Sequence, residues 1–337
     1  MCRWRSRCPD DPTILEKPLR LGSGGCRGIN QWRMVIDQDN HRDDELRWSF
    51  PIDNPGNYRL LAVDIDGTLL NKGMLDQADV AALHAAARRG IIVCLCTGRS
   101  WPEARGIWEQ LQLPEPHAPV ICAGGALVAE PDTGRTLYSR SFTRPEAQEL
   151  AEQMLQLGYP VMALVDAWRE GFDYFLMGNY EQRPLYQRFL TAVKRRIRTV
   201  DRLDRDDYPR PLRLSLLEEP GKGRPIVEAL KKHFDTRIVV QDIYLSHREV
   251  DIVEAFSAGT DKFTALVYLG QGFHIAPSQF AAIGDDNNDL VMLRNSALSG
   301  TPADAPEQLK QSADIILPPR GKSPVASFVE HILQKSR

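Results

Sequence analysis

The sequence predicts an α/β protein with a parallel sheet that is interrupted by a second domain. Apolar segments without polar alternation recur between amphipathic segments from Arg59 onward, as in parallel strands that helices cover on both faces. From about Thr143 to Gln241 the candidate strands are shorter and alternate with polar residues, which is typical of an antiparallel sheet packed on helices. After Gln241 the alternation of apolar strands and amphipathic helices resumes. An α+β domain inserted into the α/β core explains this order of segments.

The predicted core alternates between strands and helices. Before the insert come the strand RLLAVDID, a helix in DQADVAALHAAARRG that Gly90 ends, the strand IIVCLCTG, a helix over 101–112 and the strand PVICAGG. After it come the strand EVDIVEAF, a helix from Lys262 to Leu269, the strand FAAIGDD, a helix over 288–294, and a last strand and helix. We therefore predict a core over 58–142 and 242–337.

The predicted insert, 143–241, mixes helices and short strands. Its helices are expected over 144–157, over 181–196 and after Gly221, and its strands at VMALV, FDYFLM and RLSLL. Residues 1–57 mix Gly, Pro, Arg and Asp without sustained periodicity, so we predict a flexible N-terminal extension there.

Composition narrows the possible partners. The chain has 337 residues, of which 42% are hydrophobic and 26% charged, and its formal net charge is −3. This balance offers no general attraction for nucleic acid or anionic membranes, so we expect a small-molecule partner. No apolar run approaches the roughly 18–20 residues of a membrane span, and the six cysteines form no C-x-x-C pair. A cytoplasmic location is the prediction.

Two clusters of carboxylates end two of the predicted strands. In LLAVDIDGTLLNKG, Asp64 and Asp66 project to the same side of an extended segment, where two like charges favour a bound cation. A solvated Asp-Gly turn is the simpler alternative for this segment alone. FAAIGDDNNDL adds Asp285, Asp286 and Asp289 at another strand end, and such ends meet at one edge of a parallel sheet. Together they predict an oxygen-rich Mg²⁺ site.

Four ordered motifs carry a family resemblance. They are DIDGTL at 64–69, TGR at 97–99, Lys262 and GDDNND at 284–289. The chain thereby resembles a haloacid dehalogenase superfamily phosphatase, type IIB, of the Cof-like group, over about Arg59 to Leu333. This resemblance implies a Rossmann-like parallel core with an inserted α+β cap that determines specificity. It also implies a Mg²⁺-dependent phosphatase that acts on a phosphorylated metabolite, commonly a sugar phosphate, through an aspartyl-phosphate intermediate.

The resemblance assigns a role to each motif. Asp64 is expected to be the nucleophile and Asp66 the general acid and base, since phosphoryl transfer by a carboxylate splits hydrolysis into two displacements. Thr97 and Lys262 are expected to hold the phosphoryl oxygens. The expected phosphate-binding residues are Gly67, Thr97, Gly98, Arg99 and Lys262. The expected metal-binding residues are Asp64, Asp66 through its carbonyl, and Asp285, with Asn288 and Asp289 nearby.

Three positions depart from the family pattern. Gly124-Gly125-Ala126 stands where relatives commonly have Asn-Gly-Ala, Phe263 follows the lysine where a glycine is common, and TPADAPE occupies 301–307. These departures put substrate choice and efficiency in doubt rather than the type of reaction. Two alternatives stay open on other grounds. The same aspartate could pass the phosphoryl group to a sugar hydroxyl, as in a phosphotransferase or mutase acting on sugar phosphates, and the fold could serve a metabolite-binding protein without catalysis, although the presence of both Asp64 and Asp66 argues against the latter.

Overall fold

The computed structural model describes residues 58–115, 117–193, 196–245 and 249–335, and the statements below concern these residues. The predicted flexible extension over 1–57 lies outside them. By compactness the chain divides after Trp32, so every described residue belongs to the second unit, Arg33–Arg337. The described strands of this unit form an eight-stranded sheet, a six-stranded sheet and the small hairpin β2 (Leu70–Asn71) and β3 (Met74–Leu75).

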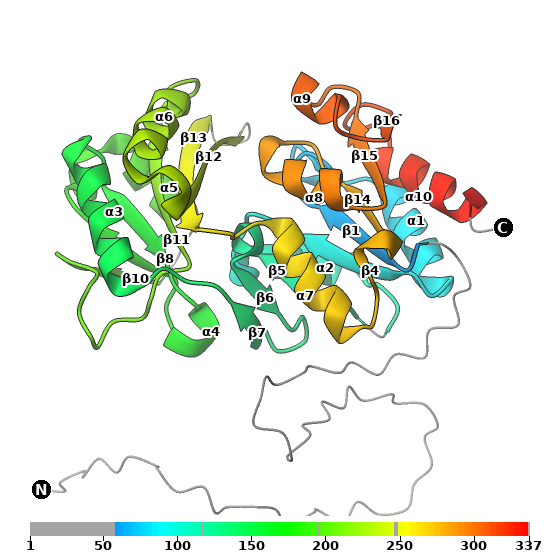
Figure 1. The fold of residues 1–337 in the computed structure, drawn as a ribbon, viewed down its shortest axis with the longest axis horizontal. Helices are drawn as coiled ribbons and strands as arrows, with labels where there is room; N and C mark the ends of the chain where they lie inside the picture. The colour runs from blue at the N-terminus through cyan, green and yellow to red at the C-terminus, as the bar shows by residue number, and fades with distance from the viewer. Residues whose placement is uncertain (1–57, 116, 194–195, 246–248, 336–337) are drawn as a thin grey trace, which may run out of the picture. The chain divides into compact units, whose positions relative to one another are not determined.

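The eight-stranded sheet is the predicted α/β core (Figure 1). Its strands, in spatial order, are β16 (Ile315–Leu317), β15 (Leu298–Pro302), β14 (Phe280–Ile283), β1 (Leu60–Asp64), β4 (Ile92–Cys96), β5 (Val120–Cys122), β6 (Leu127–Ala129) and β7 (Thr136–Ser139). Strands β16 to β5 are parallel, and β6 and β7 extend the sheet in antiparallel fashion. The predicted parallel sheet is confirmed, and its antiparallel edge was not foreseen.

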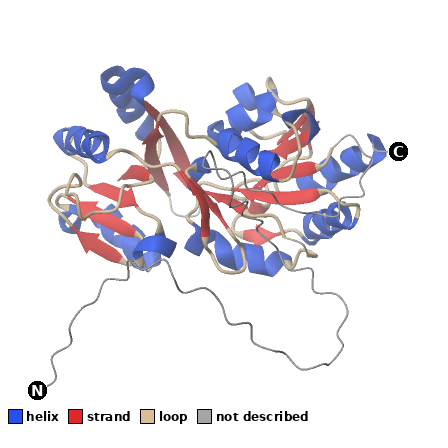
Figure 2. Cartoon of the chain, turned by 60° about the horizontal axis from the view of Figure 1, so that its bottom comes forward, coloured by secondary structure: helices blue, strands red, loops and turns tan. Residues whose placement is uncertain are grey.

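Six helices belong to the described core: α1 (Gln77–Arg88), α2 (Trp101–Leu111), α7 (Lys262–Gly272), α8 (Leu290–Asn295), α9 (Glu307–Lys310) and α10 (Pro324–Lys335). Local signals set their starts. Asp76 caps α1 by accepting the Ala78 N–H, and Ser100 and Glu103 form a capping box at α2. Figure 2 shows helices beside the strands of both sheets.

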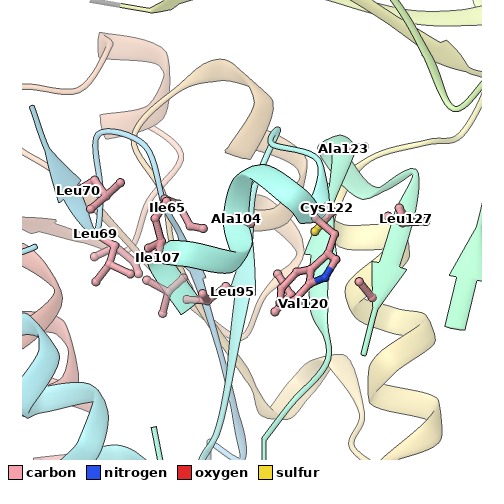
Figure 3. Close-up of a cluster of buried hydrophobic side chains, with 14 of the residues drawn as sticks. Ile65, Leu69, Leu70, Leu95, Ala104, Ile107, Val120, Cys122, Ala123 and Leu127 are labelled. Atoms are coloured by element: carbon pink, nitrogen blue, oxygen red, sulfur yellow. The ribbon is translucent and has the colours of Figure 1, made fainter. Parts of the chain in front are cut away.

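The core is built around the central strand β1. All five residues of β1 are buried between its neighbours β14 and β4. Figure 3 shows Leu95 and Val120 beneath Ala104 and Ile107 of helix α2, in one cluster of buried side chains. Each fully buried Leu or Ile contributes about 1.5–3 kcal/mol relative to an exposed one, so this packing fixes the strand ends in space.

The second sheet belongs to the cap, which we define as residues 143–257. Its strands, in spatial order, are β10 (Ile197–Thr199), β9 (Tyr174–Met177), β8 (Val161–Leu164), β11 (Arg213–Glu218), β13 (Val250–Ser257) and β12 (Ile238–Leu245). All described neighbours are antiparallel except β9 and β10. The cap helices are α3 (Arg144–Gln156), α4 (Ala167–Glu170), α5 (Pro184–Val193) and α6 (Gly223–Phe234).

One predicted strand lies in the other sheet. EVDIVEAF was expected to resume the core, but β13 pairs antiparallel with β11 and β12 in the cap sheet. The prediction was wrong because β13 is buried on both faces within the cap, so its apolar run looks like a parallel core strand. The expected return to the core at residue 242 therefore cuts through β12, and we place that return after Ser257.

The helix predicted over 181–196 is shorter than expected. A 3₁₀ turn over Tyr180–Gln182 precedes it, and α5 begins at Pro184. Proline suits the first helical position because the N–H that it lacks would have no partner there. Among the described helices, none is long and apolar enough to cross a membrane.

Candidate active site

Three neighbouring strand ends place the predicted catalytic residues at one edge of the core sheet. Asp64 is the last residue of β1, Thr97 follows β4, and Asp285 follows β14 by two residues. The three strands are parallel and adjacent in the sheet, so their carboxyl ends lie side by side. Open α/β sheets bind ligands at this edge.

A buried acidic cluster lies at this edge. Carboxylate oxygens of Asp64, Asp285 and Asp289 lie within 4.8 Å of one another, and all three residues are buried. Lys262, which begins α7, donates to Asp64 Oδ1 at 2.6 Å and to Asp289 Oδ1 at 2.7 Å. The lysine is only 1% exposed, so it is an internal cation rather than the solvated surface residue that lysines at helix starts usually are.

The electrostatics of the cluster favour a further cation. Burial raises the pKa of Asp64 well above its ordinary value against the pull of Lys262, and Asp289 and Asp285 add to the rise. Burial and Asp289 raise the pKa of Asp285 to about 6, against Arg320 and Thr68. The carboxylates of Asp289 and Asp64 outweigh burial at Lys262 and raise its pKa. The site therefore holds more carboxylate charge than its own cations balance.

Arg320 is a site residue that the sequence did not reveal. From the loop after β16, it donates to Asp285 Oδ2 at 2.6 Å and to the carbonyl of Gly67 at 3.1 Å. Thr68 donates to the other oxygen, Asp285 Oδ1, at 2.7 Å. Gly67 has a φ of +87°, and a Cβ there would overlap the Asp285 carboxylate. Both features hold Asp285 against the loop that follows Asp64.

Asp66 lies apart from the acidic cluster. Its carboxylate forms a two-point pair with Arg99, with Nε to Oδ2 at 2.7 Å and Nη2 to Oδ1 at 2.6 Å. Its side chain is therefore not among the grouped carboxylates, and of the Asp66 atoms only the carbonyl was assigned to the metal by the resemblance. Both residues face the same cavity, so Arg99 couples the predicted phosphate turn to Asp66.

The predicted phosphate turn follows β4. Thr97 is fully buried, and its Oγ1 accepts the Arg99 N–H at 3.1 Å. The Thr97 backbone N–H donates to Ile121, and its carbonyl accepts from the Gly124 N–H. These bonds fix the turn between β4 and α2, and the Thr97 hydroxyl donates to none of the described residues.

The turn after β14 holds the remaining predicted metal residues. Asp289 Oδ2 accepts the backbone N–H groups of Asp285 and Asp286 at 3.1 and 3.3 Å. Asn288 Oδ1 is buried without a hydrogen-bond partner among the described residues. An unpartnered oxygen beside grouped carboxylates fits a hard, oxygen-seeking divalent cation, which needs several oxygen ligands. The donor set therefore fits the metal that the sequence predicted.

Each of the three departures makes a defined contact in the structure. Gly124 has a φ of +63°, and a Cβ there would lie 2.8 Å from Cζ of Phe256, so the phenylalanine ring occupies the space of a larger side chain. Asp304, within the 301–307 turn, accepts from Arg320 and thus joins that turn to Asp285. Phe263 packs edge-on against Phe280 in the core.

A cavity of about 1080 Å³ opens over Asp64 and Asp66, whereas the buried residues Thr97 and Lys262 are not among its lining residues. Its floor includes Asp64, Asp66 and Arg320 of the core. Its described lining also includes residues from the inward face of the cap sheet: Met162, Tyr174, Arg213, Ser215, Ile252 and Glu254. Core groups and cap groups can therefore contact one ligand.

The fold and the site define the class: a capped α/β enzyme with a buried acidic centre at the carboxyl edge of a parallel sheet. Comparison with known proteins gives the family. The chain matches the haloacid dehalogenase-like hydrolases over residues 61–329 and belongs to this family. It is a phosphatase of the haloacid dehalogenase type, and the predicted family resemblance is confirmed.

Curated relatives and a solved structure agree with this assignment. The putative phosphatase YxeH of Bacillus subtilis is 26% identical over 260 residues, covering 76% of this chain and 92% of the relative. A protein of Aeropyrum pernix named phosphoglycolate phosphatase is 25% identical over 285 residues, covering 84% and 96%. A haloacid dehalogenase-like hydrolase of Bacteroides thetaiotaomicron shares the fold, with a TM-score of 0.65, 21% identity and coverage of 82% and 99%.

Proposed function

We propose that the chain is a magnesium-dependent phosphatase that hydrolyses a small phosphorylated metabolite through an aspartyl phosphate on Asp64. The observation that carries this proposal is the buried cluster of Asp64, Asp285 and Asp289 around Lys262, which opens into the cavity at the edge of the sheet. A sugar phosphate remains the predicted substrate class, and a cytoplasmic location remains a prediction. The metal would be held by Asp64, Asp285 and the Asp66 carbonyl, with Asn288 and Asp289 close by.

The first displacement forms a bond between a carboxylate oxygen of Asp64 and phosphorus. The ester P–O bond breaks, and Asp66 gives its proton to the leaving oxygen. Lys262, the Thr97 hydroxyl and the Gly98 backbone N–H stabilise the charge that develops on the phosphoryl oxygens. When bound, the divalent cation supplies further charge neutralisation at these oxygens.

Arg99 connects substrate binding to the protonation of the Asp66 carboxyl group. In the structure its guanidinium binds both oxygens of Asp66, a geometry that suits an ionised carboxylate. A phosphoryl group at the turn would compete for the same guanidinium. Asp66 would then be released to carry a proton for the first displacement. In the second displacement the ionised Asp66 removes a proton from water, which attacks phosphorus and frees Asp64.

A phosphate-release assay with p-nitrophenyl phosphate tests this proposal. We expect release that requires Mg²⁺, that stops with excess EDTA and that returns when Mg²⁺ is restored. A mutase would instead convert sugar phosphates with little free phosphate, and a binding protein would do neither. Absence of Mg²⁺-dependent release from both the nitrophenyl ester and a panel of metabolite phosphates would reject the proposal.

A further inference from the structure

The cap carries a buried ion pair on the wall of the catalytic cavity. Arg213 of β11 is 5% exposed and Glu254 of β13 is 3% exposed, and the two are joined through Arg213 Nη1 and Glu254 Oε1. Their neighbours on this wall include the apolar side chains of Met162, Ile243 and Ile252. Since a buried pair adds little net stability compared with apolar packing, its place on the wall calls for another explanation.

The pair lies directly against the predicted phosphate turn. Arg213 Nη1 donates to the carbonyl of Gly98 at 2.8 Å, and Nη2 donates to the Tyr174 hydroxyl at 3.3 Å. Gly98 is the residue between Thr97 and Arg99. The pair is therefore placed where the leaving group of a bound phosphate ester would begin.

One carboxylate oxygen of Glu254 has no hydrogen-bond partner in the described part of the chain. Oε2 is buried and makes no hydrogen bond to any residue that the structure describes. It faces the phosphate turn, because it lies 3.9 Å from where a Cβ on Gly98 would be. Gln241, opposite Glu254 in the β12–β13 ladder, interacts with the carboxyl group without satisfying Oε2. A buried carboxylate oxygen without a donor favours a ligand that supplies one.

The charges of the cavity restrict what that ligand can be. Among its described lining residues seven are acidic and four are basic. Three of the four cations, Arg99, Arg213 and Arg320, already pair with carboxylates, and the fourth is Lys72. A divalent cation and a phosphoryl dianion cancel each other to first order, so substrate binding leaves the acidic excess in place. A second anionic group on the substrate would meet repulsion.

We propose that Glu254, held by Arg213, selects phosphate monoesters whose leaving group is uncharged and donates a hydrogen bond to Oε2. A hydroxyl or N–H group near the ester satisfies this oxygen. A carboxylate or second phosphate there adds a like charge beside it. The inference rests on the proposed phosphatase activity and refines its substrate class. It sets this chain apart from relatives named for phosphoglycolate, whose leaving group bears a carboxylate.

Matched substrate pairs test this selectivity in the wild-type protein. Glucitol 6-phosphate is compared with 6-phosphogluconate, and glycerol 3-phosphate with 3-phosphoglycerate, because each pair differs by one carboxylate in place of a CH₂OH group. We expect kcat/KM, or the inhibition constant against p-nitrophenyl phosphate for esters that are not hydrolysed, to favour the neutral member at least about tenfold. Equal or better binding of the acidic members would overturn the inference.

The two proposals fail in different ways. If neither p-nitrophenyl phosphate nor the panel of metabolite phosphates is hydrolysed, the proposed phosphatase activity fails, and calorimetric dissociation constants for the same pairs still decide the selectivity. If the nitrophenyl ester is hydrolysed but the acidic members are preferred, only the selectivity fails.

A single substitution assigns the effect to Glu254. Glu254→Gln keeps the shape and removes the charge, and we expect it to shrink the neutral-to-acidic ratio at least about threefold. Glu228→Gln, at an exposed position of α6 on the same cap, is the matched control and should leave the ratio unchanged. A folded Glu254→Gln protein with the wild-type ratio would contradict the assignment. The wild-type comparison stands without any variant.

Discussion

The core site and the inward face of the cap hold their charges differently. In the core, Asp64, Asp285 and Asp289 crowd around Lys262, and burial raises the pKa of Asp64 well above its ordinary value. On the cap, one matched pair, Arg213 and Glu254, lies among apolar side chains. The core cluster has more carboxylates than cations, which suits the binding of a metal ion and a phosphoryl group. The cap pair has one charge of each sign in an apolar wall, which suits discrimination between leaving groups. Changes in the core should therefore alter the rate with every ester, and changes in the cap should alter the ranking of esters.

The largest expected effect belongs to Asp64→Asn. An amide cannot attack phosphorus, so kcat should fall at least about 1,000-fold with every ester. The melting temperature should stay the same or rise, because the buried amide replaces a carboxylate whose pKa burial raises. Phosphate release and calorimetry check both outcomes, with the exposed Asp132→Asn as a control. Substantial Mg²⁺-dependent hydrolysis by the pure variant would remove Asp64 from its assigned role.

Lys262→Met should cost both activity and stability. The substitution leaves Asp64 and Asp289 buried without their shared cation, a change that typically costs about 3–5 kcal/mol. We expect the loss of unfolding free energy to be partly recovered by millimolar Mg²⁺, since a divalent cation replaces the missing charge. Urea denaturation with and without Mg²⁺ measures this difference. A variant as stable as the wild type in EDTA would show that the lysine does not balance the cluster.

Arg320→Lys should weaken metal binding while keeping the charge. A lysine cannot bridge Asp285 and the Gly67 carbonyl as the guanidinium does. Mutation of a group that orients a metal ligand typically lowers metal affinity about 10–100-fold. We expect the lower end of this range because the lysine keeps the positive charge and one donor nitrogen. The Mg²⁺ concentration for half-maximal activity is the measurement, and Arg294→Lys on α8 is the control. An unchanged Mg²⁺ requirement would show that Arg320 does not orient Asp285.

Phe189→Ala should alter the ranking of phosphate esters by kcat/KM rather than lower the rate with every ester. Phe189 lies on α5 of the cap and lines the cavity. Its truncation removes apolar contact with a large leaving group, so we expect kcat/KM for glucose 6-phosphate to fall about 5–10-fold. Acetyl phosphate, which is too small to reach this side chain, should stay within about threefold. Leu157→Ala, at an exposed cap position, is the control. Equal losses with both substrates would place Phe189 in the folding of the cap instead.

The smallest expected effect concerns stability and pH at Asp79, a core residue outside the cavity lining. Burial raises its pKa to about 6, against the hydrogen bond from the Ala326 N–H. The folded state then binds the proton more tightly than the unfolded state, whose pKa is near 3.8. This stabilisation is complete below about pH 3.8 and is lost as the pH rises through about 6.

Asp79→Asn keeps the acceptor for Ala326 and removes the titration. Relative to the wild type, its melting temperature should therefore rise by about 4 °C between pH 4 and pH 7. Calorimetry at several pH values measures this difference. A difference that stays constant with pH would show that Asp79 does not titrate in this range.

The contrast between core and cap also explains what the sequence could predict. Asp64, Asp66, Thr97, Asp285 and Asp289 stand in short motifs at strand ends, and parallel strands bring such ends to one edge. The family followed from these motifs, whereas the parallel core and the inserted cap followed from the pattern of apolar and polar segments. The local sequence around each of these residues was enough to predict its place in the site, because each motif consists of a strand end, a turn and the start of a helix.

Other residues of the site come together only through folding. Arg320 reaches Asp285 from a loop 35 positions away, and Arg213 reaches Glu254 across 41 positions. A single arginine in a polar loop has no periodicity or spacing that would mark it. Strand β13 was misplaced for a related reason, because burial on both faces looks the same in either sheet.

The most direct test of the account is to trap the phosphoryl group on Asp64. In Asp66→Asn the second displacement lacks its base, while acetyl phosphate has a leaving group that needs no proton, so the intermediate should accumulate. Borohydride reduction after acid quenching converts an aspartyl phosphate to homoserine, which peptide mass spectrometry locates. We expect homoserine at position 64 only when acetyl phosphate and Mg²⁺ are both present. Phosphate release with no modification at position 64, or with modification at another carboxylate, would contradict it.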